Sequence, residues 1–422
     1  MFFQGLAAVA AAAMTAETDM GASRNDGSDY TRRGDDHIWF EAVSDLGAPP
    51  GVATGYWLNE SLKSDNAACL DGTAPLYYHR PGTGTGANKW YIHHEGGGWC
   101  YNLGACQGRS NTALGSTNPA KSKDGPTANL GGGYFSTDPT QNPQMYNWNA
   151  VFLRYCDGGS FSGSNATSTM VGGDTLWFRG KHVLKAMQTD LLANRGLDKG
   201  TDVVISGCSA GGLATFLHVD NWAGVLKAEA PQAKVRGMPD SGFFLDVEQG
   251  PQYHSNMQWV FTYMNSTSGV NDKCIAGNAG NEWKCIFAEH TSPFISTPIF
   301  PLQGEYDSWQ MCCDAGYETT DGKMTAQINA WGAKLTELVQ TNLLKPNPLH
   351  GIFLDSCLHH CGGWGSYEID GMTQGPAFER WYNNPNPNPN SNPNPGVHIQ
   401  GKPYPCADCC KPTSRLNATA LA

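Results

Sequence analysis

Among the features of this sequence, a strand-like run that ends in a turn containing a serine constrains the possible folds most strongly. Residues 203–206, Val-Val-Ile-Ser, lead directly into Gly207-Cys208-Ser209-Ala210-Gly211, and a helical apolar pattern covers 211–219. A Gly-x-Ser-x-Gly sequence between a strand and a helix is typical of a nucleophile elbow, whose sharp turn lifts the serine hydroxyl above a sheet. The pattern therefore predicts that Ser209 is a nucleophile. The alternative is a glycine-rich turn that only packs a helix against a strand.

A second glycine-rich turn follows an earlier expected strand, 89–94, in the sequence Glu-Gly-Gly-Gly-Trp-Cys. Consecutive glycines leave backbone N–H groups open to approach, as in the oxyanion holes of lipases and esterases. We expect Gly97, Gly98 and the residue after the nucleophile, Ala210, to stabilise an oxyanion. A phosphate-binding loop explains the segment less well, because neither Lys-Ser/Thr nor Gly-x-Gly-x-x-Gly spacing accompanies it.

An activated serine also needs a base and an acid that orients the base. Asp307 follows an expected strand at 299–303, and His359 and His360 follow another at 350–354. This is the order Ser, Asp, His of α/β-hydrolases. Spacing alone does not choose between the two histidines. Three further carboxylates near strand ends remain open as alternatives, either as the acid or in the pocket: Glu305, Asp355 and Asp240.

Short apolar runs alternate with helical patterns along most of the chain, which predicts a mostly parallel sheet covered by helices. The expected strands are 89–94, 150–155, 203–206, 299–303 and 350–354. The expected helices are 175–193, 211–219 and 325–344.

Composition excludes several kinds of protein. The 422 residues are 40% hydrophobic, which is enough apolar material for a large core. Only 15% are charged and the net charge is -11, so no basic surface is available for nucleic acid or an anionic membrane. Beyond the N-terminal run, no stretch approaches the roughly 18 apolar residues that a membrane span requires.

The cysteines and the N-terminus predict secretion. Fourteen cysteines are scattered between Cys69 and Cys410, a pattern typical of disulfides in an oxidising compartment. Residues 2–14 are uncharged and apolar and then turn polar, which resembles a signal peptide over 1–16. Four sequons fit a secreted glycoprotein: Asn59, Asn165, Asn265 and Asn417.

The remaining organisation follows from composition. We expect a polar leader at 17–50, one domain at 51–382, an extended Asn/Pro tether at 383–396 and a Cys-rich segment at 397–422. Cys208 is interpreted as a small buried hydrophobe without a catalytic role. A zinc site at Cys406 and Cys409 with the paired histidines is disfavoured, because a secreted context favours disulfides. We expect neither metal nor cofactor.

Several motifs together resemble the pectin acetylesterase family, which also includes the Notum carboxylesterases. The resemblance spans about 69–382 and 403–410. It rests on HHEGGGWC (93–100), RYCDGGSFSG (154–163), LWFRGKHVLKAM (176–187), SGCSAGGLA (206–214), DSGFFLD (240–246), EYDSWQ (305–310), SCLHHCGG (356–363), CLDGTAPLYYHR (69–80) and PYPCADC (403–409). The Asn/Pro tract and the paired cysteines at 312–313 and 409–410 depart from the family pattern.

The resemblance implies a disulfide-stabilised α/β-hydrolase fold and a secreted, monomeric serine esterase without a cofactor. It implies that Ser209, His360 and Asp307 form the triad, with the GGGW loop and Ala210 as the oxyanion hole. We place Trp99, Asp240 and Phe243 in the substrate pocket. The implied substrate is an acetylated cell-wall or extracellular polysaccharide such as pectin. Two alternatives stay open: a Notum-like deacylase acting on a longer acyl chain, and a non-catalytic glycan-binding protein.

Overall fold

The computed structural model describes residues 51–247, 252–384 and 396–410. The expected signal peptide and leader, nearly all of the Asn/Pro tract and the sequon at Asn417 lie outside these ranges. Within them, no helix is long and apolar enough to cross a membrane.

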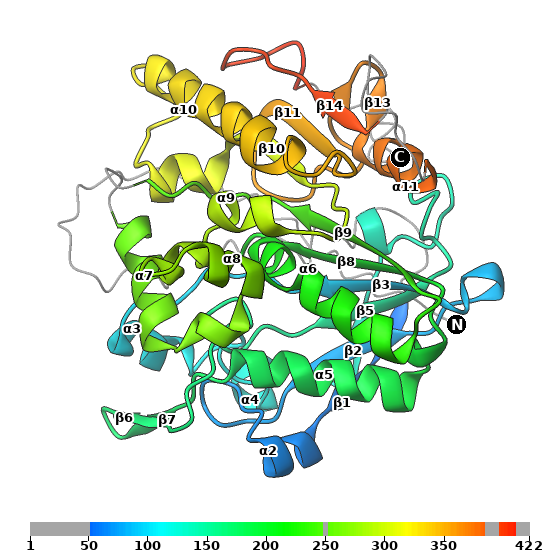
Figure 1. Cartoon of the computed structure of the whole chain (residues 1–422), viewed down its shortest axis with the longest axis vertical. Helices are drawn as coiled ribbons and strands as arrows, with labels where there is room; N and C mark the ends of the chain where they lie inside the picture. Colours follow the sequence, from blue (N-terminus) through cyan, green and yellow to red (C-terminus); the bar gives the residue numbers. More distant parts are fainter. Residues whose placement is uncertain (1–50, 248–251, 385–395, 411–422) are drawn as a thin grey trace, which may run out of the picture. The chain divides into compact units, whose positions relative to one another are not determined.

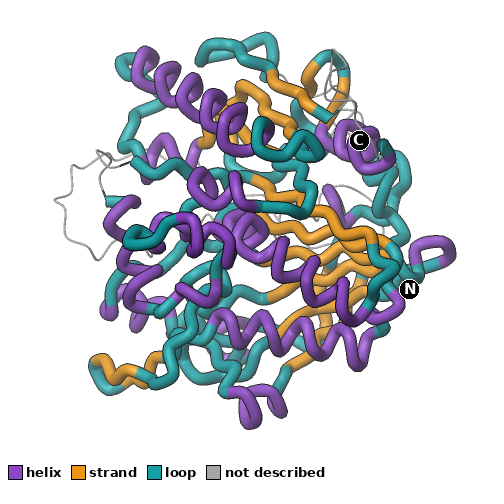
Figure 2. Tube along the Cα trace, viewed as in Figure 1, coloured by secondary structure: helices purple, strands orange, loops and turns teal. Residues whose placement is uncertain are grey.

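A mixed sheet of ten strands runs through the described part of the chain, in the order β14-β11-β10-β9-β8-β3-β5-β2-β1-β4 (Figures 1 and 2). The strands from β14 to β5 are parallel to one another, and β2, β1 and β4 extend the sheet in antiparallel pairs. The bounds are β1 Val52–Trp57, β2 Leu76–Arg80, β3 Lys89–His94, β4 Thr127–Asn129, β5 Asn149–Leu153, β8 Asp202–Cys208, β9 Lys234–Asp240, β10 Leu302–Asp307, β11 Ile352–His359 and β14 Val397–Ile399.

Helices cover both faces of the sheet, because neighbouring side chains of each central strand point to opposite faces. In β8, Val203 and Ile205 belong to the apolar core that also contains residues of α5, α6 and α10, whereas Val204 belongs to a second core with residues of α11. The helices are α2 Asn59–Asp65, α3 Leu103–Arg109, α4 Pro119–Ser122, α5 Gly180–Arg195, α6 Ala210–Glu229, α7 Tyr253–Tyr263, α8 Asp272–Gly277, α9 Ala288–Thr291, α10 Thr325–Leu338 and α11 Gln374–Asn383.

Short elements complete the loops. Two small hairpins are β6 Thr169–Val171 with β7 Asp174–Leu176, and β12 Glu368–Ile369 with β13 Met372–Thr373. The single-turn elements are η2 Gly84–Gly86, η3 Gly133–Phe135, η4 Leu197–Lys199, η5 Ser266–Gly269, η6 Glu282–Ile286, η7 Ser292–Phe294, η8 Gln310–Asp314 and η9 Val339–Leu344.

Two strands end further along the chain than expected. The strand expected at 299–303 is β10, Leu302–Asp307, and the one expected at 350–354 is β11, Ile352–His359. The apolar pattern does not predict the last residues of these strands, because several of them are polar. Their side chains are nevertheless buried, since they have hydrogen-bond partners. Ser356 of β11, for example, donates to Glu305 of β10 (2.8 Å). Asp307 and His359 are therefore the last residues of their strands.

All fourteen cysteines lie in described residues and all are paired. The interpretation of Cys208 as a small hydrophobe is wrong, because Cys208 forms a disulfide with Cys361. The bridges are Cys69–Cys156, Cys100–Cys106, Cys208–Cys361, Cys274–Cys285, Cys312–Cys313, Cys357–Cys410 and Cys406–Cys409. The disulfide stabilisation expected from the sequence is thus present.

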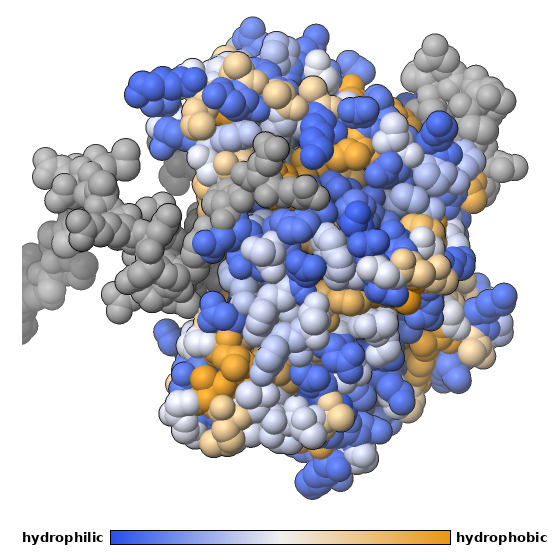
Figure 3. Space-filling model, turned by 60° about the vertical axis from the view of Figure 1, so that its left-hand side comes forward, coloured by the Kyte–Doolittle hydropathy of each residue, from blue (hydrophilic) through white to orange (hydrophobic). Residues whose placement is uncertain are grey.

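Hydrophilic residues predominate on the face of the molecule drawn in Figure 3, and the hydrophobic ones lie in small separate groups. Among the described residues, the large hydrophobic side chains that are exposed are Val52, Met170 and Leu349.

Candidate active site

Ser209 lies in a strained turn between β8 and α6, with φ 59° and ψ -125°. Close packing on both sides of the turn requires glycine. A Cβ on Gly207 would lie 2.2 Å from the carbonyl oxygen of Gly211, and one on Gly211 would lie 2.1 Å from the carbonyl oxygen of His94. Ser209 itself is half-buried at the end of the strand. This is the geometry that places a serine hydroxyl above a sheet.

His360 and Asp307 are brought together by the ends of β10 and β11. The imidazole Nδ1 of His360 lies 2.8 Å and 3.0 Å from the two carboxylate oxygens of Asp307. Asp307 is fully buried and also accepts from the backbone N–H of Gln310 (3.0 Å). The other nitrogen of His360, Nε2, has no hydrogen-bond partner among the described residues. It is therefore available to a nucleophile or a substrate.

The alternative acids have other partners. Asp355 pairs with His359, whose Nε2 lies 3.0 Å and 3.1 Å from its carboxylate oxygens. Glu305 accepts from Ser356 and Thr336. Burial raises the pKa of the Glu305 carboxyl. Of the carboxylates considered from the sequence, Asp307 is the one bonded to His360.

Asp240, at the end of β9, supports both the serine turn and the histidine loop. Its backbone oxygen accepts from the N–H of Ser209 (3.0 Å), and its carboxylate accepts from Tyr134 (3.0 Å) and from the N–H of Gly362 (3.1 Å). Burial raises its pKa. The disulfide Cys208–Cys361 joins the same two loops covalently. Asp240, expected in the pocket, is thus completely buried beneath the site.

Side chains from other segments donate hydrogen bonds to the carbonyl groups of the glycine loop after β3. Gly97 and Gly98 have positive φ values of 122° and 60°. The carbonyl of Gly97 accepts from Arg109 (2.8 Å), and that of Gly98 accepts from the hydroxyl of Tyr155 (2.9 Å). Because C=O and N–H point in opposite directions in a trans peptide, these contacts also fix the N–H groups of Gly98 and Trp99.

The loop also packs directly on the serine turn. A Cβ on Gly96 would lie 2.4 Å from the carbonyl oxygen of Cys208 and 3.1 Å from the Cβ of Ser209. On the other side of the turn, Ala210 is the first residue of α6, where the N–H has no partner within the helix. The backbone donors expected from the sequence thus come from segments that lie next to Ser209.

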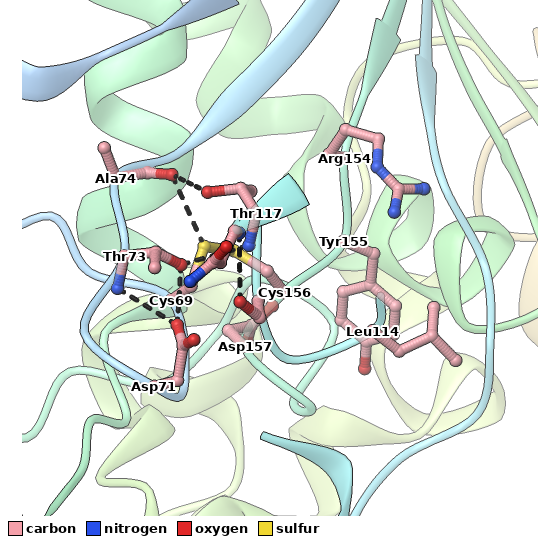
Figure 4. The surroundings of a disulfide bond; sticks show 12 residues. Cys69, Asp71, Thr73, Ala74, Leu114, Thr117, Arg154, Tyr155, Cys156 and Asp157 are labelled. Atoms are coloured by element: carbon pink, nitrogen blue, oxygen red, sulfur yellow. Dashed lines mark hydrogen bonds between the residues drawn. A yellow bond between two sulfur atoms is a disulfide. The ribbon is translucent and has the colours of Figure 1, made fainter. Parts of the chain in front are cut away.

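A disulfide and a cation–π contact hold Tyr155, which supports this loop. Tyr155 precedes Cys156, whose bridge to Cys69 fastens the segment after β5 to the one before β2 (Figure 4). Thr117 donates to the carbonyl of Ala74 (2.6 Å) and holds the second of these segments in place. The Arg109 guanidinium lies 4.9 Å from the centre of the Tyr155 ring.

Four aromatic side chains pack together beside His360: Trp99, Phe244, Tyr253 and Trp309. The Trp99 ring lies 5.1 Å from that of Phe244, 5.5 Å from that of Tyr253 and 5.7 Å from that of Trp309. The His360 ring lies 6.1 Å from Phe244 and 6.3 Å from Trp309. Phe243, expected in the pocket, is fully buried against Phe216 of α6.

Comparison with known proteins identifies the family of the chain. A family model described as Pectinacetylesterase matches residues 53–411. The chain belongs to this family. It is 31% identical to Pectin acetylesterase 5 of Arabidopsis thaliana, over 84% of each chain. It is 33% identical to Pectin acetylesterase 7 of the same plant, over 75% of this chain and 82% of the relative. It is 28% identical to the human palmitoleoyl-protein carboxylesterase NOTUM, over 77% of this chain and 66% of the relative.

This pectinacetylesterase-family member is therefore a carboxylic ester hydrolase with an α/β-hydrolase fold. Sequence reasoning missed Phe244, Tyr253 and Trp309 as neighbours of the site. Phe244 and Trp309 lie inside DSGFFLD and EYDSWQ, so those two motifs carried the signal. Tyr253 lies in no motif, and only the fold brings its ring to Trp99.

Among the described residues, two groups of side chains have atoms close enough together to hold a metal ion. Cys357, Cys409 and Cys410 form the first group, but their sulfur atoms are in disulfides. Asp246, Glu289 and His290 form the second, outside the residues discussed above.

Proposed function

We propose that this esterase hydrolyses acetyl esters of an extracellular or cell-wall polysaccharide such as pectin, with Ser209 as nucleophile, His360 as base and Asp307 as the orienting acid. One observation carries the proposal. His360 is bonded through Nδ1 to both oxygens of Asp307 and keeps Nε2 unpaired, on a loop joined by a disulfide to the residue before Ser209.

The reaction proceeds in two acyl-transfer steps. His360 Nε2 takes the hydroxyl proton of Ser209 as its oxygen attacks the ester carbonyl, and Asp307 stabilises the imidazolium that results. The imidazolium then protonates the departing sugar oxygen, which leaves an acetyl group on Ser209. Water, deprotonated by His360, attacks that acyl group and releases acetate.

Charge that develops on the carbonyl oxygen is stabilised by the backbone N–H groups of Gly97, Gly98 and Ala210. The contacts of Arg109 and Tyr155 fix the peptide planes of the glycine loop before substrate arrives. Donors that need no rearrangement during the reaction stabilise the transition state most effectively. The Trp99 N–H, whose peptide plane Tyr155 fixes, is a further candidate donor.

Close packing beside His360 supports a short acyl group. Phe244 and Trp309 lie next to the imidazole, and both rings are in contact with each other and with Trp99. A long acyl chain entering there has to displace these side chains, whereas an acetyl group adds only one methyl group beyond the carbonyl.

The disulfides and the expected signal peptide support a location outside the cell. Demethylated pectin is a polyanion, and the chain has a net charge of -11, so the two repel at long range. We expect the rate on acetylated homogalacturonan to fall as salt is lowered, because salt screens this repulsion. A rate that rises at low salt contradicts this part of the proposal and indicates a local basic site.

The first test compares the purified protein with Ser209→Ala on a chromogenic acetyl ester. We expect the variant to lose at least about 1,000-fold in kcat, as removal of a catalytic nucleophile does. Ser64→Ala, an exposed serine on α2, is the matched control and should keep full activity. Equal rates for wild type and Ser209→Ala refute the assignment. Absence of turnover in the wild type as well supports the non-catalytic glycan-binding alternative.

The second test measures kcat/KM on esters from C2 to C16. We expect the highest value at C2 and a steep fall beyond C4. Phe244→Ala removes one of the rings beside His360 and should shift activity toward longer acyl chains, whereas Phe353→Ala, in the core on the other face of the sheet, should not. A preference of the wild type for C8 or longer overturns the acetyl assignment and favours a Notum-like deacylase.

A further inference from the structure

A mixed group of carboxylates and imidazoles lies apart from the proposed triad. Asp246 follows β9, and Glu289 and His290 lie on α9. The Nε2 atom of His290 is 3.0 Å from Oδ2 of Asp246 and 3.3 Å from Oε1 of Glu289. One ligand atom from each of the three residues lies within 4.8 Å of the other two. Both carboxylates are nearly buried, with side chains 7% and 8% exposed.

The spacing suits a small divalent cation. Nitrogen and oxygen ligands bind Zn²⁺ at about 2.0–2.2 Å, so neighbouring ligand atoms in a tetrahedral site lie about 3.4 Å apart. The two distances from His290 Nε2 lie within a few tenths of an ångström of this value. An ion could therefore replace the present hydrogen bonds without rearrangement of the backbone.

A third carboxyl, that of Asp314, is influenced by the charges of this group. Asp314, the last residue of η8, is fully buried, and neither of its carboxylate oxygens has a hydrogen-bond partner among the described residues. Burial and the charges of Asp307, Asp246 and Glu289 raise the pKa of its carboxyl to about 8, so the group is mostly protonated at neutral pH. A cation bound by Asp246 and Glu289 would offset their charges and favour the ionised form of Asp314.

His254 completes the surroundings of the group. Its Nδ1 lies 2.5 Å from Oδ1 of Asp246, on the carboxylate oxygen that does not face His290. A carboxylate that binds a metal through one oxygen is commonly held through the other by such a partner. The Tyr253 hydroxyl is buried and has no hydrogen-bond partner within the described part of the chain.

We propose that Asp246, Glu289 and His290 bind a structural divalent transition-metal ion, for which Zn²⁺ is the best match. One imidazole with carboxylates suits Zn²⁺ better than Ca²⁺, which takes six to eight oxygen ligands. The ion joins α9 to the segment after β9. That segment follows Asp240, whose backbone oxygen accepts from the N–H of Ser209.

The experiment uses the full chain after treatment with EDTA and dialysis. Equilibrium dialysis against Zn²⁺, with metal measured by mass spectrometry, should give one ion per chain. At about one hundred times Kd, the midpoint of thermal unfolding should rise by about 3–5 °C. Mn²⁺ should bind more weakly, and Ca²⁺ at the same concentration should produce no shift. None of these readouts depends on ester hydrolysis, so they test the site independently of the proposed function.

Two substitutions separate metal binding from hydrogen bonding. His290→Gln keeps a side-chain donor for Asp246 but removes the imidazole ligand. Glu289→Gln keeps a side-chain acceptor for the N–H of Asp246 but removes a carboxylate ligand. Each should weaken Zn²⁺ binding at least about tenfold. Asp321→Asn, an exposed aspartate, is the matched control and should bind as the wild type does. If either test variant fails to fold, Asp246→Asn replaces it.

The outcomes that refute the site are equally definite. Absence of Zn²⁺ binding at millimolar concentration overturns the proposal. So does binding that survives both His290→Gln and Glu289→Gln, because the ion then lies elsewhere. A preference for Ca²⁺ over Zn²⁺ also overturns it, since that result indicates general attraction to acidic groups.

Discussion

Replacement of His359 by glutamine should change how the stability of the domain depends on pH. His359 lies next to the proposed base in the chain but points to a different carboxylate, Asp355, and both side chains are almost completely buried. Burial lowers the pKa of His359. The charge of Asp355, its hydrogen bond and the charges of Asp240 and Asp307 outweigh burial and raise the pKa to about 9.

The sign of the effect follows from the proton balance. A histidine in the unfolded chain has a pKa of about 6.5, so unfolding above that pH releases the proton that folded His359 keeps. The stabilisation is complete below pH 6.5 and is lost as pH rises through 9. At about 1.4 kcal/mol for each pKa unit, the pair contributes about 3 kcal/mol, most of which disappears between pH 7 and 9.5.

Urea denaturation at a series of pH values measures this contribution. Wild type should lose about 2 kcal/mol more than His359→Gln between pH 7 and 9.5. His350→Gln is the matched control, because burial lowers the pKa of His350 to about 4. The free energy of unfolding of that variant should differ in pH dependence from wild type only below pH 6.5. Parallel curves for wild type and His359→Gln above pH 7 refute a protonated His359.

Three further perturbations test how the site is held. Replacing both Cys208 and Cys361 by alanine opens a loop of 153 residues. Urea denaturation should show that the free energy of unfolding falls by up to about 5 kcal/mol. The substitutions should reduce kcat by a larger factor than they raise KM. Gly96→Ala should reduce kcat at least about 100-fold, because the new Cβ would lie 2.4 Å from the carbonyl oxygen of Cys208. Gly224→Ala is the control: its Cβ enters open space on α6, so the substitution should stabilise the folded protein by about 1 kcal/mol and leave activity unchanged. Arg109→Met removes the donor to Gly97 and should lower kcat about tenfold at unchanged KM, as measured on an acetyl ester.

The sequence predicted those parts of the fold that depend on local patterns. β3 has the expected bounds, and the serine turn lies between a strand and a helix as its glycines indicated. The first strongly wrong boundary, at the start of α5, has a local cause. Residues 174–176 form one strand of a hairpin, although their apolar spacing continues the helical pattern. The sequence pattern alone cannot distinguish a helix from a strand here, because pairing with the partner strand β6 determines which one forms.

The site required long-range information at two points. Asp307 and Asp355 both follow strands expected from the sequence, and nothing local states which histidine each will meet. β10 and β11 pair in parallel with an irregularity between Gly304 and Tyr306, which aligns Asp307 with His359 in the ladder. The next residue, His360, then reaches Asp307, while His359 turns to Asp355. Only the register of two strands separates these arrangements.

The proposed nucleophile and base come from opposite ends of a long segment, yet one small cluster fixes their separation. Asp240 receives the N–H of Ser209 on its backbone oxygen and that of Gly362 on its carboxylate, while its neighbour Ser241 receives the N–H of Cys361 (2.7 Å). The disulfide Cys208–Cys361 spans the same gap. Two kinds of connection across one gap imply that loss of either alone leaves the loops in place at low temperature. Combining Asp240→Asn with removal of the disulfide should therefore lower kcat by more than the product of the separate effects, and simple multiplication of the two effects would show that the connections act independently.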